Sequence, residues 1–257
     1  MNDILEFLLM LHKKNLSYSC INTARSALSC FVKIDGIDVG KHPLVSRFMK
    51  GIFQIKPTKS RYNEIWDINV VFDYIRNMEN NELLSLKKLT LKTVTLMALI
   101  SSQRIQSIHN ICLSNMCVDE SKYVFYLGKI KQSRPNCKSF YMTLEKFPSE
   151  EKLCIFHSLT EYLKRTDGLR NGCDKVFISF LKPHKQVSKS TIARWIKTFL
   201  GSAGIDIKKF SAHSTRAASS SAAKQNGVPV GEILKRAGWS SEKTFLKFYN
   251  LNIVKNN

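Results

Sequence analysis

The stretch from Lys87 to Ser101 constrains the fold of this 257-residue chain more than any other part of the sequence. If the stretch is helical, apolar side chains fall on every side of the helix, at Leu89, Leu91, Val94, Leu96, Met97, Leu99 and Ile100. A helix that is apolar all round must be covered by other elements, so we expect it to lie at the centre of a core. The longest largely apolar stretches of the chain, Ile4–Leu11 and Thr93–Ile100, are far shorter than the roughly 20 residues needed to cross a bilayer. No membrane span is therefore predicted.

The charge of the chain indicates a polyanionic partner. Its 40 Lys and Arg residues outnumber its 20 Asp and Glu residues, which leaves a net charge of +20. Such a balance favours nucleic acid or an anionic surface over a small acidic substrate. Residues 39–63 contain no acid, and their bases are the candidate DNA-binding residues Lys41, Arg47, Lys50, Lys56, Lys59 and Arg61. Residues 56–62, which contain Pro57, are interpreted as a basic linker that lies against the polyanion, and a solvated charged loop is the alternative.

The cysteines favour an intracellular protein without a metal. There are seven of them, an odd number, with no C-x-x-C pair, which is typical of free thiols in a reducing compartment. Residues 1–6 carry two acids and no base, unlike a secretory signal. His109, Cys112 and Cys117 form a cluster of possible metal ligands, but a second ligand pair is missing. We therefore predict no metal site.

Periodicity and turn residues predict two domains, residues 1–61 and residues 62–257. The first is all helical, with helices at 2–12, 19–34 and 43–55. The second mixes helices with a small antiparallel sheet. Its predicted helices are 68–78, 87–101, 151–164, 190–200, 212–225, 229–236 and 241–250. Strands at 123–127 and 139–144 form a hairpin, and a short strand is expected at 176–179. The fold class is thus mainly α with a small antiparallel β-sheet.

Two arginines and a histidine suit a bound phosphate. Arg104 follows the central helix, so its guanidinium is expected to point into a cleft, although a solvated turn arginine is the alternative. His213 and Arg216 are three residues apart at a helix start and share one face. Residues 207–231 contain no acid to pair with them, and a guanidinium presents a planar fork of donors to a phosphate. Residues 217–223, which are all Ala or Ser, are interpreted as a close-packing helix surface.

The order of these residues along the chain resembles the tyrosine recombinase or phage integrase family. An arginine, a hairpin lysine, His-x-x-Arg, a tryptophan and a tyrosine follow one another here as Arg104, Lys131, His213, Arg216, Trp239 and Tyr249. The resemblance is closest to recombinases of eukaryotic mobile elements, such as the Crypton and DIRS-like groups. It rests there on Lys131-Gln-Ser-Arg-Pro135, on Gly238-Trp-Ser-Ser241 and on Phe248-Tyr249.

The resemblance implies a helical DNA core-binding domain and a catalytic domain that close as a clamp on double-stranded DNA, with self-assembly into a dimer or tetramer. It implies that Arg104 and Arg216 hold the non-bridging oxygens of the scissile phosphate and that Tyr249 attacks the phosphorus, leaving a 3′-phosphotyrosyl linkage. Lys131 would protonate the departing 5′ oxygen, and His213 and Trp239 would donate hydrogen bonds or manage protons. No metal or cofactor is implied, and the location would be nuclear in a eukaryote.

Some features depart from the family pattern. Ser107 stands where the family often has an acid beside the first arginine, and Lys129 competes with Lys131 because it lies on the same face of the hairpin. The helical domain is shorter than usual and is expected to be truncated, and only eight residues follow Tyr249. A catalytically inactive, host-adopted DNA-binding protein is the alternative function. A metal-dependent transposase, which needs three placed acids, is disfavoured.

Overall fold

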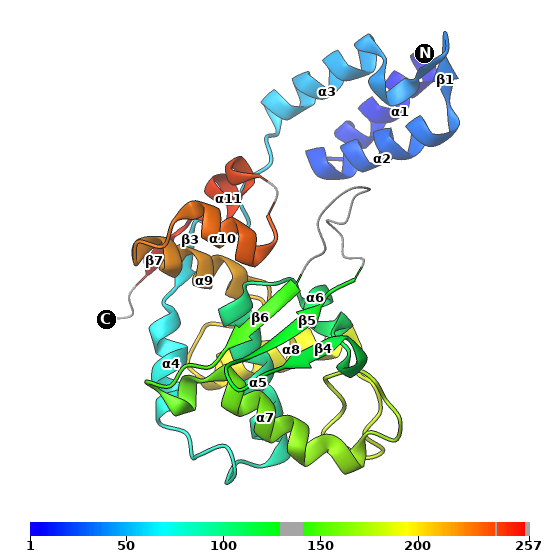
Figure 1. The fold of residues 1–257 in the computed structure, drawn as a ribbon. Helices are drawn as coiled ribbons and strands as arrows, with labels where there is room; N and C mark the ends of the chain where they lie inside the picture. The colour runs from blue at the N-terminus through cyan, green and yellow to red at the C-terminus, as the bar shows by residue number, and fades with distance from the viewer. Residues whose placement is uncertain (129–140, 240, 255–257) are drawn as a thin grey trace. The chain divides into compact units, whose positions relative to one another are not determined.

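The computed structural model describes residues 1–128, 141–239 and 241–254, and the chain forms two compact units, Met1–Arg61 and Tyr62–Asn257 (Figure 1). Each unit has its own hydrophobic core. The predicted Lys129 and Lys131 lie outside the described residues.

The first unit is a small helical domain. Its helices are α1 (Asn2–Lys13), α2 (Tyr18–Phe31) and α3 (Pro43–Ile55). Ser17 caps α2 by accepting a hydrogen bond from the backbone N–H of Cys20, and Pro43 occupies the first turn of α3. The three helices bury a compact core made of Leu8, Ile21, Val39, Val45, Met49 and Ile52. The three predicted helices are thus confirmed.

The predicted end of the second helix, at Ile34, is wrong. Helix α2 ends at Phe31, and a hairpin of β1 (Lys33–Ile34) and β2 (Ile37–Asp38) follows it. The turn residues Asp35 and Gly36 both have positive φ, 50° and 75°. A two-residue turn of this kind closes a tight hairpin and is favoured by Asp-Gly. A 3₁₀ turn, η1 (Val39–Lys41), leads into α3.

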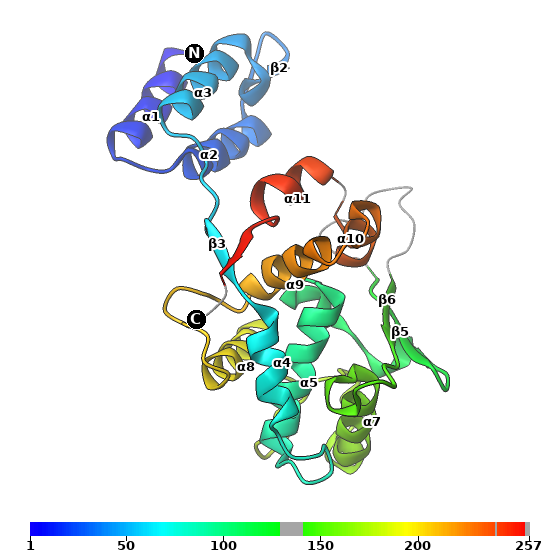
Figure 2. The ribbon, with the colours of Figure 1, turned by 90° about the vertical axis from the view of Figure 1, so that its left-hand side faces the viewer.

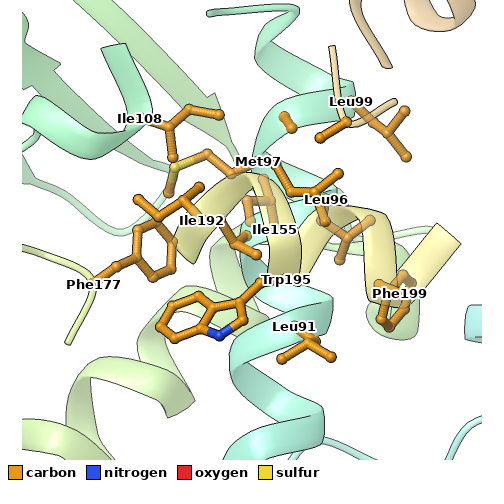
Figure 3. Packing of buried hydrophobic residues seen from close by; sticks show 14 of the residues in the cluster. Leu91, Leu96, Met97, Leu99, Ile108, Ile155, Phe177, Ile192, Trp195 and Phe199 are labelled. Atoms are coloured by element: carbon orange, nitrogen blue, oxygen red, sulfur yellow. The ribbon is translucent and has the colours of Figure 1, made fainter. Parts of the chain in front are cut away.

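In the second unit, α5 (Leu86–Ser101) is the central helix that the sequence predicts. It packs against α7 (Ile155–Thr166), α8 (Lys189–Ser202), α9 (Ser214–Gln225) and β6 (Tyr141–Glu145). Figure 3 shows Leu96 and Met97 of α5 among side chains from the surrounding helices, including Ile155 and Ile192. From Leu89 to Ser101, α5 is buried on nearly every side, so its C-terminal end is held by the core.

The remaining helices surround this core. They are α4 (Ile68–Arg76), α6 (Ile105–Asn110), α10 (Val230–Ala237) and α11 (Glu242–Phe248), with 3₁₀ turns η2 (Leu113–Asn115), η3 (Glu151–Leu153) and η4 (Asp167–Leu169). The predicted helix at 151–164 is a 3₁₀ turn followed by α7, and the last predicted helix stops at Phe248 instead of Asn250.

Two small sheets complete the unit. The antiparallel sheet has the order β4 (Met116–Val118), β5 (Lys122–Tyr126) and β6, which confirms the two predicted hairpin strands. The second sheet was not predicted: β3 (Glu64–Trp66) pairs in parallel with β7 (Asn252–Val254). Figure 2 shows this pair beside α9, so the two ends of the unit meet at the helix that carries His213 and Arg216.

The strand predicted at 176–179 is wrong. This segment makes only an isolated bridge, between Ile178 and Gln186. Its backbone pairs partly with scattered backbone groups, since the N–H of Val176 donates to the carbonyl of Ile111 and that of Ser179 to the carbonyl of Lys185. Side chains supply other partners: Arg170 donates to the carbonyl of Val176, and the Tyr162 hydroxyl accepts from the N–H of Ile178. The backbone groups are therefore satisfied without a ladder.

Within the described ranges, no helix has the length and apolarity to cross a membrane. Over the same residues, no three His, Cys, Asp or Glu side chains gather as metal ligands. His109 lies 3.0 Å from the carbonyl of Val187, and Cys112 accepts from Lys175. The described cysteines are free thiols.

Lys92 of α5 is fully buried, which the apolar pattern of the helix does not predict. Its ammonium donates to the side-chain oxygen of Asn81 at 2.8 Å. Burial lowers the pKa of Lys92 to about 8, and the positive charge of Lys152 adds to the effect. The folded chain therefore releases this proton at a lower pH than the unfolded chain, in which lysine titrates near its ordinary value.

We expect the stability cost of Lys92 to be fully present below pH about 8 and to disappear as the pH rises toward 10.5. In that window the unfolded chain binds more protons, so stability rises with pH by up to ~3 kcal/mol. The Lys92→Met variant loses this dependence. Between pH 7 and pH 10.5, urea unfolding should show the free energy of unfolding of the wild type rising by about that amount relative to that of the variant. Lys88→Met, an exposed change on the same helix, is the control, and a pH-independent difference for Lys92→Met contradicts the prediction.

Candidate active site

Arg104 lies in the turn that ends α5, as the sequence predicts. Ser102 has a left-handed backbone (φ 49°), which stops the helix. The hydroxyl of Ser102 bonds to that of Ser219 at 2.7 Å, and the side-chain amide of Gln103 donates to the carbonyl of Arg236 at 2.7 Å. These two contacts orient the turn. The Nη1 atom of Arg104 is buried and has no hydrogen-bond partner among the described residues.

The first turn of α9 is held by the segment that begins the second unit. The hydroxyl of Tyr62 accepts from the N–H of Ser211 at 3.1 Å, and the indole of Trp66 donates to Ser214 at 2.8 Å. His213 is the N-cap residue of α9, and Arg216 follows in the first turn. Both residues are thereby placed at the end of the helix beside β3.

Arg216 is fully buried. Its Nη1 donates to the carbonyl of Ser102 and, at 3.1 Å, to that of Ala237. Its Nε and Nη2 atoms have no hydrogen-bond partner in the described part of the chain. Burial lowers the pKa of Arg216, the positive charge of Arg104 lowers it further, and Tyr249 opposes the shift. A guanidinium still stays protonated at neutral pH. The site therefore holds a buried positive charge with two unused donors.

Trp239 returns to the site through a glycine turn. Gly238 ends α10 with a φ of 67°, and the N–H of Trp239 donates to the carbonyl of Leu234 at 2.9 Å. The guanidinium carbon of Arg216 lies 4.4 Å from the indole centroid. The indole Nε1 is buried and also has no hydrogen-bond partner among the described residues.

Tyr249 lies directly after α11, and its N–H donates to the carbonyl of Phe245 at 2.9 Å. Its hydroxyl is 3.3 Å from Nε2 of His213, its ring is 4.7 Å from the indole of Trp239, and the guanidinium of Arg216 is 5.7 Å from its ring centroid. The fold therefore brings His213, Arg216, Trp239 and Tyr249 together from three separate segments.

The basic residues of the first unit are in different situations. Lys41 forms an ion pair at 2.7 Å with Asp38, the acid that immediately precedes the acid-free stretch. Lys56 donates to the carbonyls of Asn15, at 2.7 Å, and Leu16 and so closes the end of α1 within the unit. The other four are exposed on this unit: Arg47, Lys50, Lys59 and Arg61. The structure thus gives Lys56 a structural contact that its place in a basic run does not predict.

The arrangement suits a tetrahedral anion. Nη1 of Arg104, Nε and Nη2 of Arg216 and Nε1 of Trp239 are buried donors without partners in the described residues. Each such donor costs about 1–3 kcal/mol unless a ligand accepts from it. Ser107, which stands where the family often has an acid, is buried and donates its N–H to the carbonyl of Arg104. The described residues place no carboxylate in an ion pair with Arg104.

A family model for the phage integrase family matches residues 69–253, a range that includes Arg104, His213, Arg216, Trp239 and Tyr249. The chain belongs to the phage integrase family. This confirms the family named from the order of Arg104 to Tyr249, whereas closeness to eukaryotic mobile elements is not shown. No curated protein matches the chain.

Solved structures share the fold of this family member. The Tn1549 transposon integrase in complex with transposon right end DNA has a TM-score of 0.63 and 13% identity, over 100% of this chain and 81% of that one. The XerH recombinase bound to its difH substrate has a TM-score of 0.55 and 11% identity, over 90% and 66%. A lambda integrase dimer bound to a core site has a TM-score of 0.55 and 13% identity, over 97% and 63%. This chain thus spans about two thirds of the XerH and lambda integrase chains.

Sequence reasoning missed the residues that hold the site together. Tyr62 and Trp66 bind the first turn of α9, and Ser102 and Gln103 orient the turn before Arg104. The only signal that could have found Ser102 and Gln103 is that they stand between an apolar helix and a candidate arginine. Tyr62 and Trp66 act on residues about 150 positions away and leave no local pattern.

We expect a tetrahedral anion to stabilise the free protein by satisfying the unused donors. Sulfate at tenfold its dissociation constant should add about 1.4 kcal/mol to the free energy of unfolding. Thermal unfolding in sulfate and in chloride of equal ionic strength separates this effect from screening. In Arg104→Gln most of the difference between the two salts should be lost.

Arg194→Gln, which removes one charge from the exposed side of α8, is the charge-matched control and should keep the response. If both variants keep it, or both lose it, sulfate acts on the overall charge and not on the site.

Proposed function

We propose that this integrase-family chain is a site-specific DNA recombinase that cuts and rejoins DNA strands through a 3′-phosphotyrosyl intermediate on Tyr249. The observation that carries the proposal is the position of the Tyr249 hydroxyl, 3.3 Å from His213 and beside the unpaired donors of Arg216 and Trp239. A nucleophile, a base within reach and anion donors are what phosphoryl transfer requires.

In the proposed reaction the phenol oxygen of Tyr249 attacks the phosphorus and forms a new O–P bond. His213 takes the phenol proton, and Arg104, Arg216 and Trp239 donate to the non-bridging oxygens as the charge on these oxygens increases. The bond to the 5′ oxygen breaks, and Lys131 supplies the proton of that leaving group. A second 5′ hydroxyl reverses the steps and reseals the strand.

Double-stranded DNA is the proposed substrate. The net charge of +20 supports this proposal, as do the relatives solved on DNA. Six bases of the helical unit are proposed to contact phosphates, and all of them except Lys56 are exposed: Lys41, Arg47, Lys50, Lys56, Lys59 and Arg61. We also propose self-assembly on DNA, because the lambda integrase relative is a dimer on its core site.

The hairpin sequence Lys131-Gln-Ser-Arg-Pro135 and the Gly238-Trp239 turn support a finer proposal, that the chain comes from a eukaryotic mobile element and acts in the nucleus. The alternative function is a host-adopted, sequence-specific DNA-binding protein that no longer cuts. Such a protein would keep the charge and the fold, and nothing would maintain a tyrosine against His213.

We expect a covalent adduct between Tyr249 and the 3′ phosphate of a cut strand. A nicked suicide substrate, whose cut end diffuses away, traps this adduct in the presence of EDTA. A denaturing gel should show a shifted band, and peptide mapping should assign it to Tyr249. Tyr249→Phe should bind the same DNA and give no band.

The substrate must first be shown to bind, by selecting a recognition site from a random DNA library. An adduct through another residue, or cutting by Tyr249→Phe, would falsify the assignment of the nucleophile. A bound site that yields no adduct would favour the inactive DNA-binding protein.

We expect Lys131 to be the general acid. Lys131→Ala should slow the cutting of ordinary DNA by on the order of a hundredfold to ten-thousandfold, the usual contribution of proton transfer. A substrate with sulfur in the 5′ bridging position, whose leaving group needs no proton, should be cut at nearly the wild-type rate. Lys129→Ala, two residues earlier in the sequence, is the matched control. Rescue of Lys129→Ala instead of Lys131→Ala would reassign the role.

A further inference from the structure

Three consecutive serines of α9 bond in three different directions. Ser219 bonds to Ser102 in the turn before Arg104, and Ser220 donates to the carbonyl of Arg216 at 2.6 Å within its own helix. Ser221 instead donates to the carbonyl of Tyr249 at 2.7 Å and accepts from the N–H of Leu251 at 3.0 Å. Successive residues of a helix point about 100° apart, so the hydroxyls of Ser219 and Ser221 reach different segments outside α9, whereas that of Ser220 stays within the helix.

The contacts of Ser221 are unusual for a serine inside a helix. Such a hydroxyl commonly donates to the carbonyl four residues earlier, as Ser219 and Ser220 both do. Ser221 is 1% exposed and uses both its donor and its acceptor on the segment after α11. A buried hydroxyl with both functions satisfied holds its partners in one arrangement.

These two bonds hold the backbone around the proposed nucleophile. The N–H of Tyr249 is already bonded to the carbonyl of Phe245, and β7 pairs with β3 three residues further on. Ser221 closes the gap between these anchors by binding the Tyr249 carbonyl and the Leu251 N–H. The direction in which the Tyr249 side chain leaves the backbone is thereby set by α9.

The same helix also carries the proposed phosphate donor. Ser221 is five residues after Arg216, or ~7.5 Å along the helix axis. His213, which lies against the Tyr249 hydroxyl, is the N-cap residue of α9. One rigid element therefore defines both the anion site and the backbone of the attacking residue. Small displacements at such a site are costly, since 1 Å can change a rate about a hundredfold.

We propose that Ser221 is a positioning residue that holds Tyr249 in line with the phosphate bound by Arg216. The inference rests on the proposed strand transfer. It assigns a role in the reaction to a stretch whose composition alone suggests helix packing. The Ser221 hydroxyl bonds to the backbone on either side of Asn250 and not to the phenol oxygen.

The test compares Ser221→Ala with Ser220→Ala. Ser220 is the matched control because it has the same 1% exposure, lies next in the helix and bonds only to carbonyls of α9. In single-turnover reactions on the suicide substrate, Ser221→Ala should form the adduct about tenfold to a hundredfold more slowly. Its DNA dissociation constant should stay within about twofold of wild type, because only the transition-state geometry is changed. Ser220→Ala should match wild type in both.

Ser221→Cys adds a rescue arm. A thiol is larger than the hydroxyl but keeps a donor and an acceptor, both weaker, so a rate between those of wild type and Ser221→Ala is expected. Equal rates for Ser221→Ala and Ser220→Ala overturn the proposal. So does a parallel loss of DNA binding and rate in Ser221→Ala, which indicates general damage to the fold.

Hydrogen exchange at the Leu251 amide provides a readout that does not depend on activity. This amide should exchange faster in Ser221→Ala and stay unchanged in Ser220→Ala. If wild type forms no adduct on a bound site, the proposed function fails, and exchange still decides whether Ser221 holds the segment. An unchanged Leu251 amide in Ser221→Ala overturns the positioning role whatever the activity.

Discussion

The site depends on the buried guanidinium of Arg216. One of its nitrogens donates to the carbonyl of Ser102, at the end of α5, and to that of Ala237, at the end of α10. These are the turns that carry Arg104 and Trp239. A buried carbonyl without a donor costs about 1–3 kcal/mol, so both turns are fixed where Arg216 is. The same side chain thus builds the site and offers its two other nitrogens to a ligand.

This dual role explains why the free site is costly. Arg216 is buried without a carboxylate partner among the described residues, and Arg104 adds a second positive charge. An acid would relieve the cost, but it would also occupy the donors that a phosphate needs. Charge that develops on a phosphate during transfer is stabilised best by donors that are already oriented and dry. The absence of a local acid, visible as the acid-free run at 207–231, is therefore a requirement of the site.

The sequence predicts those parts of the fold that have a long repeating pattern. Helix α5 is confirmed because apolar residues fall on every side of it through successive turns. Helix α3 is confirmed because Pro43 marks its start. The short strands β3 and β7 were missed, since three residues show no period and their partners are about 190 positions apart. The end of α2 was missed because the Asp35-Gly36 turn outweighs the helical pattern before it.

The candidate site shows the same division between residue types. Arg104, His213, Arg216 and Tyr249 stand out because cations and a phenol in this order have few other uses, whereas a serine among alanines has many. The interpretation of residues 217–223 as packing is correct for Ala217, Ala218 and Ala222, which are buried in α9. Small side chains let the helix approach α5 and the segment of Tyr249 closely enough for a short hydroxyl to reach a backbone group. Close packing is thus the condition under which Ser219 and Ser221 can position the site. The packing role of the small residues and the positioning role of these serines therefore depend on each other.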